Sequence, residues 1–186
     1  MKRPIVKYGH PVLRVKGQRV FKIDAHIRAL ATDMLETMHA ANGVGLAAQQ
    51  VGEALQLTVL DVSQVEDRPS TLKLNGKDVD PVLAMPLVLV NPQLQLADET
   101  VAGTEGCLSF PDLTAEIERS VSVRATAQTI DGAEVVFEAT GLLARALQHE
   151  VDHLNGILFI DRMSSATKVS MASKLKRLQK ETKQTL

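Results

Sequence analysis

One short segment restricts what this chain can fold into more than any other. Residues 141–154 carry apolar side chains at the spacing of an α-helix and stop before Gly156, a residue type that commonly ends helices. Within the segment His149 and His153 are four residues apart, so on a helix they lie about 40° apart in projection, on adjacent turns. Because the rest of the helix is largely apolar, the histidine face should point inward.

The two histidines flank Glu150 and complete an H-E-x-x-H pattern. Glu150 projects about 100° away from His149, close enough to reach a water held by a metal ion without displacing it. The pattern therefore offers two metal ligands and a general base, which is the arrangement of a metal-dependent hydrolase. The alternative is a chance match on a surface helix, and the apolar residues of the segment argue against it: Leu142, Leu143, Ala146 and Leu147.

A catalytic metal site of this kind needs a third protein ligand and one open position. Cys107 is the best placed candidate, because Gly106 beside it allows close approach of the backbone. The alternative for a lone cysteine is an inert, buried small side chain. The remaining histidines lie in no motif, which favours surface or satisfied core roles: His10, His26 and His39.

Composition indicates one ordinary globular domain. The chain has 186 residues, 45% of them apolar and 23% charged, with a formal net charge of −1, and the near-neutral charge gives no support to sequence-specific nucleic-acid binding. A single cysteine permits no intrachain disulfide and suits a reducing compartment. We find no signal-peptide core and no run approaching the ~20 apolar residues of a membrane span. We therefore expect a cytoplasmic protein without membrane contact.

The patterns along the chain predict an α+β fold, with antiparallel strands packed around the central metal-binding helix and a further helix at the C-terminus. A first helix is expected from Asp24 to Ala41, with Asp24 as its N-cap, and Asn75-Gly76 should form a two-residue hairpin turn. The segment Gly43–Gln50 taken alone favours a helix end and tight turn. Strands are expected in four places: Leu57–Val62, Leu87–Val90, Ser120–Ala127 and Glu134–Ala139.

The last residues form a basic tail, so we divide the chain into a catalytic domain at 1–165 and a helical tail at 166–186. From Ser164 onward six Lys or Arg residues stand against Glu181 alone, a formal charge of +5. Such a run is usually a solvated helix face. Apolar residues at three-residue steps suggest that the other side packs on the body: Val169, Ala172, Leu175 and Leu178.

Three ordered segments together resemble the peptide deformylases. They are Gly43–Gln50 (G-x-G-x-A-A-x-Q), Glu105–Ser109 (E-G-C-x-S) and Gln148–His153 (Q-H-E-x-D-H). The resemblance covers roughly residues 4–165, and three motifs in order are far more specific than one. The connection from Val65 to Met85 is longer than in the shortest members, which affects local loop structure and leaves the motifs intact.

The resemblance implies removal of the N-formyl group from the N-terminal methionine of newly synthesised polypeptides, with release of formate. It assigns Cys107, His149 and His153 as metal ligands and Glu150 as the general acid and base. Gln50 and the backbone N–H of Leu108 become the oxyanion donors. Members typically use Fe²⁺ in the cell and also bind Zn²⁺ or Ni²⁺. Arg119 sits where members often have an arginine.

A pocket for methionine is expected beside the metal. Leu142 and Ala146 lie on the same helix face as His149, and Val44 should form the opposite wall. For Arg145 we expect an aliphatic stem packed near this face with its charge in solvent. The complete set of predicted substrate-binding residues is Val44, Gly45, Glu105, Gly106, Leu142 and Ala146.

The basic tail suggests a further partner beyond N-formylmethionyl peptides. A basic helix near the ribosome would be attracted by RNA phosphates, so weak ribosome association through residues 166–186 is a hypothesis. Three other interpretations of the whole chain remain open. A zinc peptidase would need a third histidine or glutamate ligand, a non-enzymatic zinc module would need a fourth protein ligand, and an inactive member would need a lost motif residue.

Overall fold

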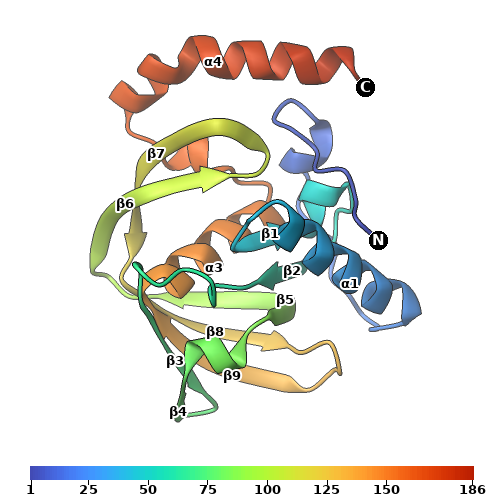
Figure 1. Ribbon diagram of the computed structural model, residues 1–186, viewed down its shortest axis with the longest axis vertical. Helices are drawn as coiled ribbons and strands as arrows, with labels where there is room; N and C mark the ends of the chain where they lie inside the picture. The colour runs from blue at the N-terminus through green and yellow to red at the C-terminus, as the bar shows by residue number, and fades with distance from the viewer.

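The computed structural model describes residues 1–186 and contains two antiparallel sheets that enclose one helix. The larger sheet has seven strands in the order β1-β2-β5-β8-β9-β3-β4, and β6 and β7 form a separate two-stranded ribbon (Figure 1). The strands are β1 (Gly45–Ala47), β2 (Leu57–Leu60), β3 (Ser70–Leu74), β4 (Lys77–Val79), β5 (Leu87–Leu96), β6 (Thr100–Cys107), β7 (Phe110–Ser120), β8 (Ser122–Gln128) and β9 (Glu134–Thr140).

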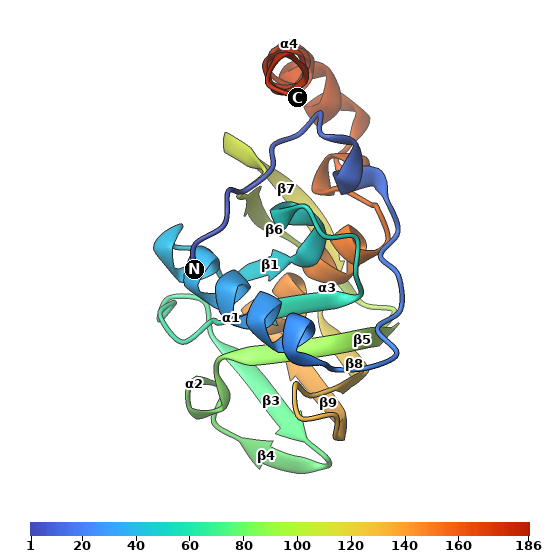
Figure 2. The same ribbon diagram turned by 90° about the vertical axis from the view of Figure 1, so that its right-hand side faces the viewer.

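Helix α3 (Gly141–Leu154) lies between the large sheet and the β6–β7 ribbon, as two perpendicular views show (Figures 1 and 2). Nearly all of its residues are buried, the polar ones included. The prediction of an α+β fold built around this helix is therefore confirmed. No helix combines the length and the apolar character needed to cross a membrane.

Three apolar clusters make up the core. The first lies between the large sheet and α3, with Phe137 and Leu143 among its fully buried members. The second packs α1 (Ala25–Ala40) onto β1, β2 and β5, and Asp24 caps this helix by accepting a hydrogen bond from the Ile27 N–H at 3.0 Å. The third joins β7 to residues 158–163 at the far end of α3.

The connection from Val65 to Met85 forms β3, β4 and the short helix α2 (Pro81–Ala84). Asn75 and Gly76 have φ angles of 47° and 81°, as a two-residue hairpin with positive φ at both positions requires. The predicted hairpin turn is thus confirmed. β3 pairs with β9 at Thr71↔Thr140, which brings the beginning of the connection to the first turn of α3.

Several strands differ from the sequence-based expectation. β6 and β7 were not predicted, because β6 contains two glycines and few apolar residues, and an alternating pattern is hard to recognise there. β5 continues to Leu96, past an irregularity between Val90 and Gln93. The prediction of a helix end and turn at Gly43–Gln50 was wrong, since strand β1 is followed by a 3-10 helix at Ala48–Val51.

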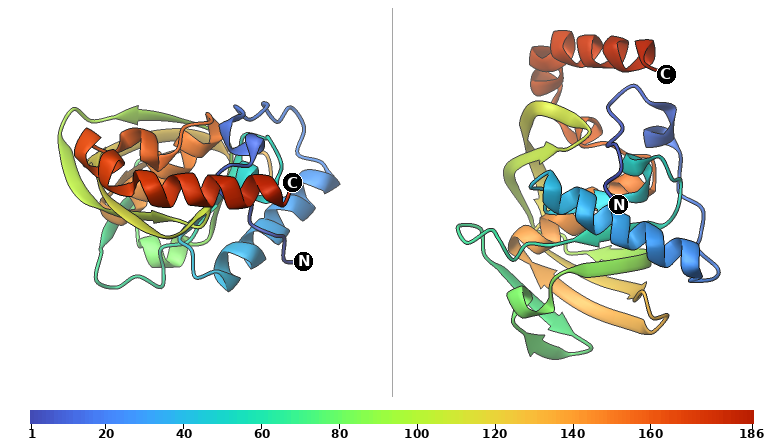
Figure 3. Two further views of the ribbon diagram at one scale, coloured as in Figure 1. Left: turned by 90° about the horizontal axis from the view of Figure 1, so that it is seen from above. Right: turned by 45° about the vertical axis from the view of Figure 1, so that its right-hand side comes forward.

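Helix α4 (Ser165–Gln184) lies across one end of the molecule, capped at Ser164 (Figures 1 and 3). Its apolar contacts with the body come from Met171, Leu175 and Leu178, which pack against the third cluster. The expected stripe was therefore wrong in part, because Val169 is 77% exposed. Steps of four and three residues keep side chains on one helix face, whereas repeated three-residue steps drift around it.

Candidate active site

Three side chains with metal-binding atoms meet beneath the β6–β7 ribbon. Cys107 is the last residue of β6, and His149 and His153 lie on successive turns of α3. Their ligand atoms all lie within 4.8 Å of one another, and Cys107 Sγ is 3.3 Å from His153 Nε2. The fold thus brings together the three residues that the sequence singled out as ligands, and no fourth histidine, cysteine or carboxylate joins them.

The chemistry and spacing of these atoms fit a divalent metal ion. Zinc bound tetrahedrally by sulfur at about 2.3 Å and nitrogen at about 2.0–2.1 Å sets a sulfur–nitrogen separation of about 3.5 Å, close to the separation found here. His149 donates from Nδ1 to Glu105 Oε1 at 2.9 Å, which leaves Nε2 free to coordinate. Burial lowers the pKa of His153 well below its usual value, which favours the neutral ring that metal binding needs. For His149 burial acts in the same direction, but hydrogen bonds with Cys107 and Glu105 outweigh it and raise the pKa.

Glu105 is a buried carboxylate held by three positively charged or polar neighbours. Besides His149, Arg119 donates to it twice, from Nε at 2.8 Å and Nη2 at 2.9 Å, and Arg145 donates from Nη1 at 2.9 Å. Burial alone would raise the pKa of Glu105, but the hydrogen bonds from Arg119 and His149 outweigh it and lower the pKa to about 2. Glu105 is therefore ionised and fixes the orientation of the His149 ring.

Arg145 departs from its expected role. Its side chain is buried, and besides Glu105 it donates to the carbonyl oxygens of Ile117 and Val101, both at 2.8 Å. A Cβ at Gly103 would lie 2.9 Å from the guanidinium. The expectation of a solvent-exposed charge was wrong because the β6–β7 ribbon, absent from the sequence-based fold, covers this face of α3 with carbonyl groups.

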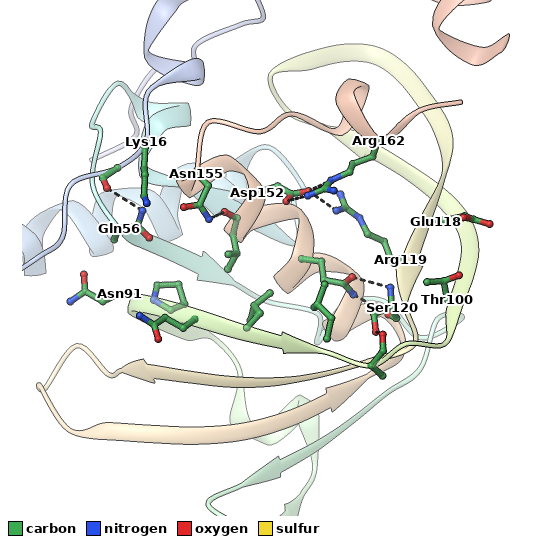
Figure 4. Close-up of a pocket in the computed structure, with 18 of the residues that line it drawn as sticks. Lys16, Gln56, Asn91, Thr100, Glu118, Arg119, Ser120, Asp152, Asn155 and Arg162 are labelled. Carbon is green, nitrogen blue, oxygen red and sulfur yellow. Dashed lines mark hydrogen bonds and ion pairs between the residues drawn. The ribbon is translucent and has the colours of Figure 1, made fainter. Parts of the chain in front are cut away.

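The ion-pair network continues to the opposite side of α3. Arg119 also donates from Nη1 to Asp152 Oδ2 at 2.6 Å, and Arg162 donates to both oxygens of Asp152 at 2.7 and 3.1 Å. Figure 4 shows the guanidinium groups of Arg119 and Arg162 directed at Asp152, at the edge of a polar hollow of about 630 Å³. No member of the metal-binding cluster lines this hollow, and Arg119 connects it through hydrogen bonds to Glu105, which is bonded to His149.

Glu150 is buried beside the three donor residues, and its Oε2 atom has no hydrogen-bond partner. Burial is the main reason that its pKa is raised to about 7; the Glu105 charge raises it further, and His149 opposes the shift. Gly45 makes room for this side chain, since a Cβ there would lie 2.8 Å from Cγ and Cδ of Glu150. A buried carboxyl group that titrates near neutrality is well suited to proton transfer.

Gln50 is held with its amide nitrogen toward the cysteine. Its Oε1 accepts from the Ala47 N–H at 2.9 Å, while Nε2 donates to Ser109 Oγ at 3.2 Å and to Cys107 Sγ at 3.5 Å. Leu108 follows Cys107 in the turn between β6 and β7, and its carbonyl oxygen accepts from Lys7 Nζ at 2.8 Å. Both predicted oxyanion donors therefore lie next to the thiol.

A cavity of about 480 Å³ opens onto this cluster. Its walls include every residue predicted to bind substrate: Val44, Gly45, Glu105, Gly106, Leu142 and Ala146. Gln50, Leu108 and Glu150 also reach it, whereas His153 lies behind the wall and is almost fully buried. Sequence reasoning missed six polar residues at the cavity, because nothing in their local sequence marks them as site residues: Lys7, Asn42, Arg68, Thr104, Asp112 and Thr114.

The fold and the site together define the class of protein as a metal-dependent hydrolase, in which one helix carries two histidines with metal-binding atoms and a buried carboxylate. Comparison with known proteins narrows this class. The sequence profile of the family described as "Polypeptide deformylase" matches residues 2–169. Among curated proteins, the peptide deformylase of Opitutus terrae is 41% identical over 181 residues, covering 96% of this chain and 94% of the relative. That of Methylacidiphilum infernorum is 43% identical over 176 residues, covering 95% and 92%.

Solved structures of peptide deformylases are also similar to this chain. The crystal structure of peptide deformylase from Thermus thermophilus is similar, with a TM-score of 0.82 and 38% identity over 97% of this chain and 99% of the other. Arabidopsis thaliana peptide deformylase 1B, solved with an inhibitor, gives a TM-score of 0.84 and 35% identity over 100% and 93%. This chain belongs to the peptide deformylase family, the metal-dependent hydrolases that remove the N-formyl group from the N-terminal methionine of new polypeptides and release formate.

Proposed function

We propose that Cys107, His149 and His153 hold the single divalent metal ion on which deformylation depends, and that Glu150 transfers the protons. The observation that carries this proposal is the unpartnered carboxylate oxygen of Glu150, buried next to three metal-binding atoms at the wall of an open cavity. No comparable cluster exists elsewhere in the molecule.

A divalent ion held by these ligands would lower the pKa of a water molecule to about 7 and polarise the formyl carbonyl. Glu150 accepts a proton from the attacking water at its free carboxylate oxygen. It then returns this proton to the departing methionine nitrogen, which cannot leave as an anion. A pKa of about 7 suits both transfers, because acceptance and return are then close to balanced at neutral pH.

Gln50 Nε2 and the Leu108 N–H would stabilise the negative charge that develops on the formyl oxygen. In the structure Gln50 Nε2 is directed to Cys107 Sγ and Ser109 Oγ, so it is already aimed at the metal-ligand cluster. A donor held in place before the reaction costs no reorganisation, and one such donor typically contributes about 3–4 kcal/mol to lowering the barrier.

The methionine side chain would occupy the apolar part of the cavity, between Val44 and the α3 residues Leu142 and Ala146. The carboxylate of Glu105 is fully engaged with Arg119, Arg145 and His149, so its contribution to substrate binding would be through the backbone of β6. Together with Gly45 and Gly106, this backbone lines the cavity without obstructing it.

For the metal we propose Fe²⁺ in the cell, with Zn²⁺ or Ni²⁺ held by the same residues in purified protein. Imidazole and thiolate ligands suit several of these ions. The discriminating experiment is an anaerobic assay of formate release from formyl-Met-Ala by the iron, zinc and nickel forms. Acetyl-Met-Ala and an internal peptide bond serve as controls, because cleavage of either would instead indicate a peptidase.

We further propose that residues 1–165 form the catalytic domain of a cytoplasmic enzyme and that residues 166–186 bind ribosomes weakly. The support for the second point is the arrangement of α4, which packs on the body through one apolar stripe and through Gln179 and Thr182 beside Gly9. Its lysines and arginines lie on the remaining, exposed surface, where ribosomal RNA phosphates would be accessible to them.

A further inference from the structure

The connection from Val65 to Met85 is fastened to the start of α3, beside the catalytic cavity. The Pro69 carbonyl accepts from the Leu142 N–H at 3.4 Å, and Ser70 Oγ accepts from the Leu143 N–H at 2.9 Å. Gly141 permits this approach, since it has a φ of +65° and any Cβ there would collide with the Pro69 carbonyl. The backbone next to Arg68 is therefore fixed against a helix whose next residue, Leu142, lines the cavity.

This anchoring places Arg68 at the mouth of the cavity. Arg68 lines the catalytic cavity and also the adjoining surface hollow on the other side of Leu142 and Arg145. Its side chain is exposed and takes part in no ion pair and no side-chain hydrogen bond, not even with the neighbouring carboxylates Glu66 and Asp67. The guanidinium is thus free to meet a ligand.

The other charged groups at the cavity are nearly all engaged. Lys7 donates to the Leu108 carbonyl, Arg145 is paired with Glu105, and Glu150 lies at the reacting centre. Asp112, an exposed residue of β7, takes part in no ion pair, and Lys7 has no acidic partner either, since it donates only to a neutral carbonyl. Arg68 shares its wall with Thr104 and Leu142. Among the cations at the cavity, Arg68 is therefore the exposed one that has neither an ion pair nor a side-chain hydrogen bond.

We propose that Arg68 selects among substrates by pairing with a carboxylate side chain in the first residues after the formylated methionine. The inference rests on the deformylase activity and deepens it, because it names a sequence preference for the polypeptide. An extended peptide bound with its methionine between Val44 and Leu142 has its following residues at the cavity mouth, where Arg68 has five donors for a carboxylate. Aspartate or glutamate near the start of the polypeptide is the favoured occupant.

The test compares pairs of formylated tetrapeptide amides that differ only by Glu or Gln at position two, three or four. For each pair the ratio of kcat/KM for Glu over Gln is measured, and this ratio is independent of metal loading and of the fraction of active enzyme. At one position at least, we expect a ratio of about two- to fivefold, the range of an exposed ion pair. The ratio should fall toward one near 1 M salt, where the screening length is about 3 Å.

Matched variants assign the effect to one side chain. Arg68→Ala should bring the ratio to about one and Arg68→Glu should invert it, while Arg68→Lys retains part of it. Arg124→Ala is the control, because Arg124 is an exposed, unpaired cation on β8 that lines neither hollow. A parallel arm with formyl-Met-Ala as free acid and as amide separates recognition of a side-chain carboxylate from recognition of the chain terminus.

Three outcomes would overturn the proposal: no charge preference in the unmodified enzyme, a preference that survives Arg68→Ala, or an equal loss in Arg124→Ala. Recognition of the terminal carboxylate alone would overturn it as well. Hydrolysis of the Gln peptides proceeds in all of these cases if the chain is a deformylase. Failure of the Arg68 proposal is therefore distinguishable from failure of the enzymatic assignment.

Discussion

The chemistry of this protein depends on a few buried charges whose neighbours decide their protonation. Glu105 and Glu150 are both buried carboxyl groups close to His149, yet their pKa values are about 2 and about 7. The difference arises because hydrogen bonds from Arg119 and His149 outweigh burial at Glu105, whereas burial dominates at Glu150, whose Oε2 has no partner. One carboxylate is therefore permanently charged and holds a histidine in place, and the other is able to exchange a proton.

Changing Glu150 to Gln should separate metal binding from turnover. The metal content should stay stoichiometric, because Glu150 is not among the three donor residues. The rate of formate release should fall by a factor of about 10² to 10⁴ through loss of proton transfer. Elemental analysis and a formyl-Met-Ala assay on one preparation test both points. A fully metallated variant with near-normal activity would be incompatible with the proposed proton path.

Changing Cys107 to Ala should remove both metal and activity, because a site with three protein ligands loses one of them. In the zinc form of the unchanged protein, X-ray absorption should detect one sulfur at about 2.3 Å. Exposure to air should inactivate the iron form by oxidising the thiolate or the metal. Retention of metal and activity by Cys107→Ala would exclude the Cys-His-His ligand set.

Asp161 should contribute to stability in a pH-dependent manner. Burial would raise its pKa, but hydrogen bonds from Arg14 and the Leu158 N–H lower it overall. A lowered folded-state pKa means that the stabilisation is present above the unfolded-state value of about 3.9 and is lost as the pH falls through the folded-state value. Arg14 and Asp161 are 44% and 37% exposed, so the effect should be only about 0.2–1 kcal/mol.

Urea unfolding of the metal-free protein at several pH values would measure this contribution. Between about pH 5 and 2, the free energy of unfolding of Asp161→Asn should depend less steeply on pH than that of the unchanged protein. Asp98→Asn is the control, because Asp98 is exposed and has no ion pair. Equal slopes for all three proteins would show that the Arg14–Asp161 pair adds nothing.

The helices and strands that could be predicted from the sequence were those marked by a strong short-range pattern. Helix α3 and the α1 cap were found because helical periodicity and an N-cap residue are short-range features. The β6–β7 ribbon was missed, and with it the reason for burying Arg145. The register of that ribbon places Glu105 opposite Ala115 and leads Arg119 back toward Glu105. Such pairing depends on contacts between distant residues, which no local pattern in β6 predicts.

The tail allows a clean test at this scale, because α4 has no fully buried residue. Truncation after Thr167 should leave hydrolysis of short formyl peptides largely intact, since no residue of α4 lines the catalytic cavity. Co-sedimentation with ribosomes at low salt should decrease, and that of the full-length protein should weaken as salt rises. Equal co-sedimentation by both forms would show that α4 does not contribute to ribosome binding and is only a solvated surface helix.

For the whole molecule, the site is assembled from segments far apart in the sequence. Gln50, Cys107 and His149 come from three separate elements, and the sequence identified them because each lies in a compact motif. Arg68 and Asp112 reach the same cavity without any motif. Their positions follow from how β3 pairs with β9 and how β7 turns back on β6. Long-range pairing of this kind is what sequence reasoning could not supply.

The late position of α3 in the chain has a consequence for biosynthesis. Helix α3 covers the apolar face of a sheet whose strands, β4 included, all precede it in the sequence. At about 5–20 residues per second, roughly 1–3 s separate synthesis of the end of β9, which connects β8 to β3 in the sheet, from that of the end of α3. During that interval the sheet face that packs on α3 is uncovered, and the chain has no histidine pair. The growing molecule is therefore most prone to aggregation just before it becomes able to hold its metal, and a shortage of chaperones should affect it at that stage.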